Sequence, residues 1–233
     1  MNPELTPSIN PSFQSPIHFV DEEKKRKQSL SDQVGILADI YQQEINMVVW
    51  RRRLPADMTS PLGPFMVANP GFQIAMPVTP VNARTDLQQA LKGSDCAESL
   101  SEDAAELVDM FCCLFDLQAV GLRLTVLSRA MCPRFHTDRV PCRLVTTYTG
   151  IATEWLPHDV VDRTKLGAGN RGLADDLSGL YQDPNDIQQL TSGDVALMKG
   201  ELWEGNENAG LVHRSPQIEL EQPRLLLTLD FAS

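Results

Sequence analysis

The chain has 233 residues, 42% of them hydrophobic, so it can bury one substantial core or at most two small ones. Its 31 acidic and 20 basic residues give a formal net charge of -11, which disfavours nucleic acid and anionic lipid as partners. We also expect no membrane span, because no stretch approaches the roughly 18 consecutive apolar residues that one requires. The absence of a secretory signal pattern and the odd number of cysteines, five, predict a reduced, cytoplasmic protein with one main domain.

The N-terminal half is predicted to contain a free arm followed by helices. Residues 1–28 are rich in Pro and lack apolar periodicity, which predicts a disordered or loosely docked arm. Residues 29–118 are predicted to form a helical region that supports the core. Its first helix would begin after Ser31, a good N-cap, and end before Pro55, because apolar residues recur there at spacings of three and four: Val34, Leu37, Tyr41, Ile45 and Val48.

The next segments alternate between loop, strand and helix. The Pro-rich and Gly-rich stretch 55–71 predicts a loop, and 72–78 (FQIAMPV) predicts a strand. A short helix is predicted over 82–93, where Gly93 would stop it. A second strong helix is predicted over 101–118, with Ser101 as its N-cap and an apolar stripe along one face.

From residue 119 onward the apolar period changes from 3.6 to 2. Six short strands are predicted, GLRLTVLSRA, RLVTTYTG, TEWL, DVALMKG, AGLVHRSP and RLLLTLDF. Residues 157–190 show no alternation and contain several glycines, so we interpret them as a long insertion of the kind that forms lids or binding loops. The pattern predicts an α+β protein whose core, residues 119–233, is a sandwich or jelly-roll barrel covered on one face by the N-terminal helices.

A candidate metal site lies in CPRFHTDRVP, residues 132–141. If this segment is a strand, His136 and Asp138 point to the same face and can bind one ion, although a histidine two residues from an acid also arises by chance. His213, at the end of a later apolar strand, supplies a third ligand. Two histidines and one carboxylate form the facial triad of non-haem Fe(II) enzymes, which leaves coordination positions open for a substrate and O2.

Further residues are candidates for holding a co-substrate. Arg224 opens the last strand, where its guanidinium could bind a carboxylate through two parallel hydrogen bonds. Tyr148 could donate a hydrogen bond to the same carboxylate, although a half-buried strand tyrosine is commoner. Arg143 could contact the co-substrate or instead pair with Glu154 across strands.

The order of these motifs resembles that of the double-stranded β-helix Fe(II)/2-oxoglutarate-dependent oxygenases over about residues 120–233. The motifs are HTD, then GDVALMKG, then HRSP, then an arginine eleven residues after the histidine. The resemblance implies a jelly-roll or cupin-like core, Fe(II) bound by His136, Asp138 and His213, and 2-oxoglutarate bound by Arg224. It also implies a Gly-Asp turn at 193–194 and hydroxylase-type oxidation of a small molecule or a protein side chain.

The whole chain is also similar to an uncharacterised bacterial family catalogued as a domain of unknown function (DUF1826 type). The segments that carry this similarity are CPRFHTDRVP, TEWLPH, GDVALMKG and GLVHRSP. The resemblance implies no activity, but we associate the family with genes of zinc homeostasis.

Zinc is the alternative to iron. Cys132 lies four residues before His136, and a set of one cysteine, two histidines and one aspartate would be closed and tetrahedral, like structural zinc. His158 is a further candidate ligand if the insertion folds back over the barrel. The alternative function is therefore a non-catalytic zinc-binding protein of metal homeostasis, and a jelly-roll module without any metal is a third. The sequence predicts no oligomeric state.

Overall fold

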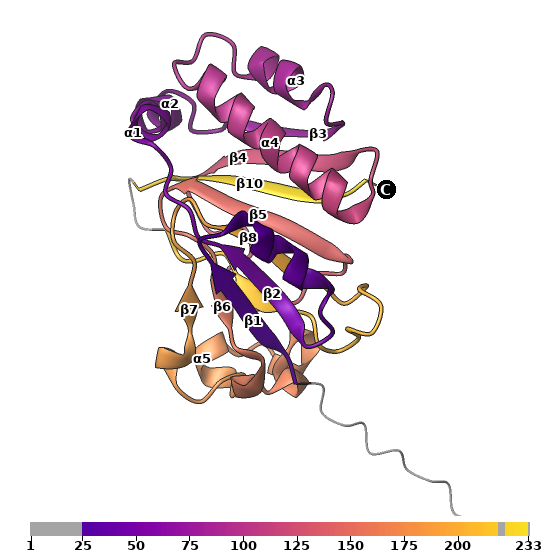
Figure 1. Cartoon of the computed structure of the whole chain (residues 1–233). Helices are drawn as coiled ribbons and strands as arrows, with labels where there is room; N and C mark the ends of the chain where they lie inside the picture. Colours follow the sequence, from indigo (N-terminus) through magenta and orange to yellow (C-terminus); the bar gives the residue numbers. More distant parts are fainter. Residues whose placement is uncertain (1–24, 219–221, 233) are drawn as a thin grey trace, which may run out of the picture.

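A computed structural model describes residues 25–218 and 222–232 and shows an α+β fold built around a seven-stranded sheet (Figure 1). The predicted arm, residues 1–28, lies outside the described residues up to position 24, and its last two residues begin the first strand. The strands are β1 (Lys27–Ser31), β2 (Ile45–Trp50), β3 (Gln73–Val78), β4 (Val120–Leu127), β5 (Cys142–Thr149), β6 (Glu154–Leu156), β7 (Gln188–Gln189), β8 (Val195–Lys199), β9 (Val212–Arg214) and β10 (Arg224–Phe231).

The helices fall into two groups along the chain. Those before residue 119 are the 3-10 helix η1 (Val34–Tyr41) and the α-helices α1 (Ala56–Thr59), α2 (Leu62–Ala68), α3 (Ala83–Ala90) and α4 (Ala97–Phe115). Those of the predicted insertion are the 3-10 helices η2 (His158–Val160), η3 (Arg163–Lys165), η4 (Gly167–Asn170) and η5 (Pro184–Asp186) and the short α5 (Asp175–Ser178). Within the described part of the chain, none of the helices has the length and apolar character that a bilayer crossing requires.

The strands form two sheets. The large sheet has the order β1-β2-β8-β5-β10-β4-β3 and is antiparallel except for the β1–β2 pair at one edge. At the opposite edge, β3 pairs only with β4, and its Pro77 lies across from Gly121. The small sheet has the order β7-β6-β9. Figure 1 shows α3 and α4 over one face of the large sheet and β6, β7 and α5 on the other side of it.

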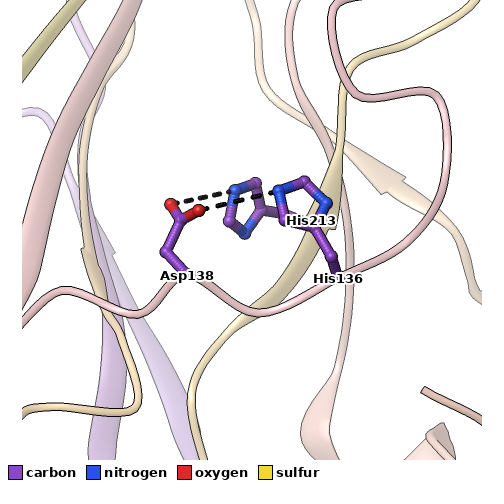
Figure 2. Close-up of side chains that lie close together, drawn as sticks. All are labelled: His136, Asp138 and His213. Carbon is purple, nitrogen blue, oxygen red and sulfur yellow. Dashed lines mark ion pairs between the residues drawn. The ribbon is translucent and has the colours of Figure 1, made fainter. Parts of the chain in front are cut away.

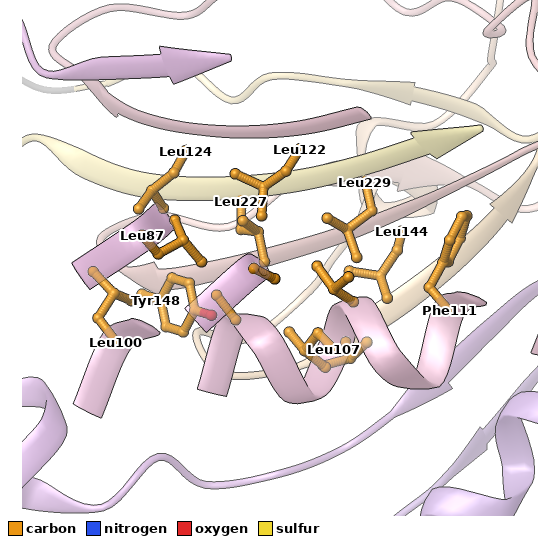
Figure 3. Close-up of a cluster of buried hydrophobic side chains, with 14 of the residues drawn as sticks. Leu87, Leu100, Leu107, Phe111, Leu122, Leu124, Leu144, Tyr148, Leu227 and Leu229 are labelled. Carbon is orange, nitrogen blue, oxygen red and sulfur yellow. The ribbon is translucent and has the colours of Figure 1, made fainter. Parts of the chain in front are cut away.

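The two faces of the large sheet have different roles, as β10 illustrates. Its residues Leu225, Leu227 and Leu229 point toward α4 and belong to the main core, in which Leu100, Leu107 and Phe111 of that helix are fully buried (Figure 3). The alternate residues of β10, Arg224, Leu226 and Thr228, face the small sheet and line a pocket. The period of two in the sequence therefore separates a structural face from a face that can hold ligands.

A second core fills the space between the two sheets. It combines Val145, Met198 and Leu226 of the large sheet with Trp155 of β6 and Leu190, which follows β7. A third cluster lies under the insertion. It includes Phe135, which belongs to residues 132–141 (called the HTD segment from here on), and Leu180 and Tyr181. The insertion thus packs against the segment that carries the candidate ligands.

The helix predicted between Ser31 and Pro55 is wrong. Residues 34–41 form the 3-10 helix η1, and residues 45–50 form the strand β2, which lies between β1 and β8. Five consecutive residues of β2 are buried, because the main core covers one face and the inter-sheet core the other. A strand buried on both faces shows no alternation, so its apolar residues could be fitted to a helical spacing.

Two other expectations for this half also need correction. Residues 55–71, predicted as a loop, contain α1 and α2, which begin after Pro55 and Pro61. Proline is well tolerated before or within the first turn of a helix, so these residues marked helix starts. The long helix begins at Ala97, not after Ser101, whose hydroxyl instead donates to the carbonyl of Glu98. The predicted strand at 72–78 and the helix before Gly93 are confirmed by β3 and α3.

Tyr148 ties the sheet to α4, which is not its predicted role. Its ring is buried in the main core, and its hydroxyl donates to Asp103 Oδ2 at 2.8 Å. Asp103 also accepts two hydrogen bonds from Arg52, at 2.5 and 2.9 Å. Burial, and then the nearby charge of Asp103, raise the pKa of Tyr148 well above its ordinary value. The hydroxyl faces the helices, so it does not reach a co-substrate on the other face of the sheet.

We expect Tyr148→Phe to lower the free energy of unfolding by about 1–2 kcal/mol, because Asp103 loses one buried hydrogen bond but keeps Arg52. Urea denaturation measures this change. Tyr41→Phe, which removes a hydroxyl bonded to Leu114 O at an exposed position, is the matched control and should cost less. Loss of bound metal from a stable Tyr148→Phe protein would contradict the assignment of this tyrosine to the fold.

Candidate metal centre

His136 and Asp138 lie in the connection between β4 and β5, outside any regular strand, so the predicted strand at this point is wrong. A single antiparallel bridge holds the segment instead. The His136 amide donates to His213 O and the His213 amide donates to His136 O, both at 3.0 Å. Because His213 is in β9, this bridge attaches the HTD segment to the edge of the small sheet. Two segments distant in sequence thus present their histidines side by side.

The three predicted ligands meet at one point (Figure 2). One potential ligand atom from each of His136, Asp138 and His213 lies within 4.8 Å of the other two. The Nε2 atom of His136 is 3.6 Å from Asp138 Oδ1, and that of His213 is 3.4 Å from Oδ2. Two imidazole nitrogens and a carboxylate that converge in this way form a donor set suited to a divalent transition metal.

Backbone carbonyls orient both imidazole rings. His136 Nδ1 lies 2.9 Å from the carbonyl oxygen of Arg134, and His213 Nδ1 lies 3.2 Å from that of Leu211. A carbonyl only accepts, so each Nδ1 carries the hydrogen and each Nε2 of the neutral ring keeps its lone pair. Metal-binding histidines are commonly fixed in this way through their second nitrogen. The rings therefore present the atoms that a metal would need.

Asp138 is held as a carboxylate. Burial alone would raise its pKa, but when the two imidazoles are protonated, hydrogen bonds from His136 and His213 and the nearby charges of His213 and Arg143 together hold the pKa well below its usual range. Arg143 Nη1 lies 2.7 Å from Asp138 Oδ2. For His136, burial lowers the pKa, and the hydrogen bonds to Asp138 and the Arg134 carbonyl outweigh it, so the net shift is upward.

Arg143 pairs with two acids of the protein itself. Besides Asp138, it binds Asp230 of β10 through Nε and Nη2, at 2.8 and 3.0 Å. It does not pair with Glu154, which instead accepts from Arg214 Nε at 2.6 Å. Arg143 therefore orients a candidate ligand, and the predicted contact with a co-substrate would have to compete with two carboxylates.

The insertion supports both ligand segments through Asp175. This buried carboxylate of α5 accepts from Arg134 Nε at 2.8 Å and from the Phe135 amide at 3.0 Å, on the HTD segment. It also lies 3.3 Å from Arg214 Nη1, beside His213. The Arg214 guanidinium is stacked over the Phe135 ring at 4.2 Å. Sequence reasoning missed Asp175, because a lone acid in an aperiodic loop carries no signal.

A pocket opens beside the histidines, between the two sheets. Its lining residues include His136, His213 and, on the large sheet, Arg224, Leu226 and Thr228. Four arginines line it, Arg123, Arg143, Arg214 and Arg224, and its described lining contains no aspartate or glutamate. The interior of this acidic protein is thus locally basic.

Arg224 is the most unusual residue of the pocket. It is only 1% exposed, and its Nη2 lies 3.3 Å from Thr153 Oγ1. Its Nε and Nη1 are buried and have no hydrogen-bond partner among the described residues. Burial lowers its pKa to about 10, so the group is still charged at neutral pH. Gly150 allows the start of β10 to pack closely against it. At its φ of +90°, a Cβ on Gly150 would lie only 2.7 Å from Arg224 Cβ.

The other predicted ligands lie elsewhere. Cys132 is exposed at the pocket wall, and the metal-binding group found among the described residues does not include it. His158 is also outside this group, and its Nδ1 lies 3.2 Å from Arg163 Nη2. The closed four-ligand set that we considered for zinc is therefore not assembled. Gly193, at φ +95°, and Asp194 form the predicted turn before β8.

The chain belongs to the family described as protein of unknown function (DUF1826), whose model matches residues 31–230. No similar sequence was found among curated proteins. Similar solved structures include a dioxygenase and a hydroxylase, both at low identity. The rice dioxygenase for auxin oxidation is 12% identical with a TM-score of 0.48, over 90% of this chain and 83% of that one. A prolyl-4-hydroxylase from Pseudomonas putida is 10% identical with a TM-score of 0.44, over 85% and 98%.

A third similar structure is HygX from Streptomyces hygroscopicus with nickel and 2-oxoglutarate bound. It is 13% identical with a TM-score of 0.41, over 84% of this chain and 85% of that one. These similarities concern the course of the backbone.

We expect His136→Ala to abolish metal retention without unfolding the protein, because it removes one of three ligands and its side chain is 33% exposed. The measurement is the metal content after anaerobic Fe(II) loading and gel filtration, with circular dichroism to check the fold. His158→Ala is the control and should retain metal. Stoichiometric metal in folded His136→Ala protein would refute the site.

Cys132→Ser should leave the affinities for Fe(II) and for zinc unchanged, because the thiol lies outside the candidate ligand group. Competition with a chelator, for zinc and iron separately, measures both affinities. Thiolates favour zinc, so a sharp loss of zinc affinity in this variant would instead support the four-ligand zinc site.

Proposed function

We propose that this protein is a non-haem Fe(II)/2-oxoglutarate-dependent oxygenase that oxidises a small molecule or a protein side chain. The observation that carries the proposal is Arg224, a buried guanidinium in the pocket that His136 and His213 also line, two of whose nitrogens have no hydrogen-bond partner among the described residues. An unpaired buried charge costs several kcal/mol, and a protein tolerates it where a ligand of opposite charge completes it. A structural metal site would have no need of this cation.

The arrangement of the strands supports a double-stranded β-helix. Consecutive segments alternate between the sheets: β4 is in the large sheet, the HTD segment bridges to the small one, β5 returns to the large one and β6 to the small one. The second half repeats this alternation, because β7 and β9 are in the small sheet and β8 and β10 in the large one. A chain that winds in this way encloses the pocket between the two sheets, as in a jelly roll.

The donor set supports iron over structural zinc. Two histidines and one carboxylate leave coordination positions open for further ligands, whereas structural zinc is bound by four protein ligands. When bound, Fe(II) and 2-oxoglutarate would allow O2 to oxidise a C–H bond of the substrate, and 2-oxoglutarate would lose CO2 and become succinate. Non-catalytic zinc storage remains the alternative that the experiment below separates.

The residues of the chain divide the work of binding. His136, Asp138 and His213 would hold the metal, and Arg143 keeps Asp138 ionised and oriented. Arg224 would bind the distal carboxylate of 2-oxoglutarate, with Thr153 fixing the guanidinium. Trp155 and Leu226 pack behind the site and exclude water. Because the chain has a formal net charge of -11, we do not expect nucleic acid or membranes to be its substrates.

Arg224→Ala should weaken 2-oxoglutarate binding by about 2–5 kcal/mol while the metal stays bound, because a desolvated carboxylate loses the buried cation assigned to it. Arg224→Lys should recover only part of the affinity, since an ammonium lacks the planar fork. The measurement is calorimetric titration of 2-oxoglutarate into anaerobic, Fe(II)-loaded protein. An absence of binding to the wild-type protein would end the proposal.

Arg224→Met separates a ligand-binding role from a structural one. The substitution removes an unpaired buried charge and keeps an apolar chain, so the ligand-free protein should unfold at an equal or higher urea concentration. A structural role for Arg224 predicts the opposite, a clear loss of stability.

A further inference from the structure

The pocket contains more cationic charge than one co-substrate needs. Of its four arginines, Arg143 is paired with Asp138 and Asp230, and Arg214 with Glu154 and Asp175. Arg224 is assigned above to 2-oxoglutarate. The remaining arginine, Arg123, has no hydrogen bond or ion pair with any of the described residues, although it is half-buried. Two guanidiniums in this pocket therefore lack an acidic partner among the residues that the structure describes.

Arg123 extends from β4, near the open edge of the large sheet. It pairs in register with Thr228 of β10 on one side and with Ala75 of β3 on the other. Side chains directly opposite each other in an antiparallel pair have Cβ atoms about 5 Å apart, so the Thr228 hydroxyl lies within reach of a group bound by Arg123. Thr228 is four positions from Arg224 along β10, or about 13 Å. Arg123 and Arg224 thus begin at different ends of the pocket.

Two hydroxyls beside Arg123 are also unsatisfied. The Oγ1 atoms of Thr125 and Thr228 are buried and have no hydrogen-bond partner among the described residues, and both residues line the pocket. Thr125 is on the same face of β4 as Arg123, two residues further along. Buried hydroxyls are rarely left unpaired, so a cation and two free donors on one wall indicate a missing acceptor.

We propose that Arg123, Thr125 and Thr228 form a second anion subsite, which binds a carboxylate of the substrate. The inference rests on the proposed function and specifies its substrate class as a small-molecule carboxylic acid. One guanidinium fork matches the two oxygens of a carboxylate, and a hydroxyl can donate to either oxygen. A phosphate dianion would call for more positive charge than this wall provides. Binding there would place the rest of the acid in the space that the metal ligands also face.

The experiment uses matched pairs of probes that differ only in charge: benzoate and benzamide, phenylacetate and phenylacetamide, hexanoate and hexanamide. Each is titrated by calorimetry into anaerobic protein loaded with Fe(II) and 2-oxoglutarate. We expect at least one acid to bind about tenfold more tightly than its amide, the effect of a charged hydrogen bond. Arg123→Gln should remove this preference, and Arg123→Lys should keep part of it. If no acid binds more tightly than its amide, the subsite is refuted.

Two variants serve as controls. Arg129→Gln removes the same charge from an exposed position just after β4, outside the pocket lining, and should keep the preference for acids. Thr228→Val should weaken acid binding about threefold to tenfold without lowering stability, because its hydroxyl is unpaired in the free protein. Unchanged acid binding in Arg123→Gln would overturn the inference, and unchanged binding in Thr228→Val would remove that hydroxyl from the subsite.

The inference and the proposed function can fail separately. Each titration is repeated with metal alone, so that the acid-to-amide preference and its dependence on Arg123 can be measured even if 2-oxoglutarate does not bind. Normal 2-oxoglutarate affinity in Arg123→Gln supports two distinct anion sites. Loss of 2-oxoglutarate binding in that variant, with Arg224→Ala unaffected, would overturn the subsite and transfer the co-substrate contact to Arg123.

Discussion

The candidate site depends on one pair of backbone hydrogen bonds, those between His136 and His213. The pair joins an irregular connection to the strand β9. It therefore fixes the position of the HTD segment as sheet hydrogen bonds would, although the segment is not itself a strand. Backbone carbonyls then set both ring orientations, and Asp138 completes the group from two residues further along. Because amide and carbonyl groups fix the register, the convergence of the three side chains follows from the path of the chain.

Pairing of charges organises the rest of the pocket. Asp175 connects the insertion to both ligand segments, and Asp230 and Asp138 together neutralise Arg143. These ion pairs leave Arg224 and Arg123 as the cations without acids among the described residues. The difference matters because the paired arginines stabilise the fold. Burying an arginine without an acid costs free energy, and a bound anion would offset that cost.

Sequence reasoning predicted which candidate ligands come together better than it predicted the segments that hold them. A sequence shows directly that His136 and Asp138 are two positions apart. It also shows that His213 and then Arg224 follow them along the chain. Tyr148 could not be placed in the same way, since alternation along β5 shows that its residues face two sides but not which side the helices cover. The partners of Arg143 and Arg134 lie far along the chain, and β2 was mistaken for helix because burial on both faces removes the alternation.

Pro77 has a consequence for how the protein behaves among other copies of itself. It is in β3, which ends the large sheet, and a proline lacks the amide hydrogen that a further strand would need. Pairing of a further strand with this edge is therefore disfavoured, and so is aggregation of several copies through it.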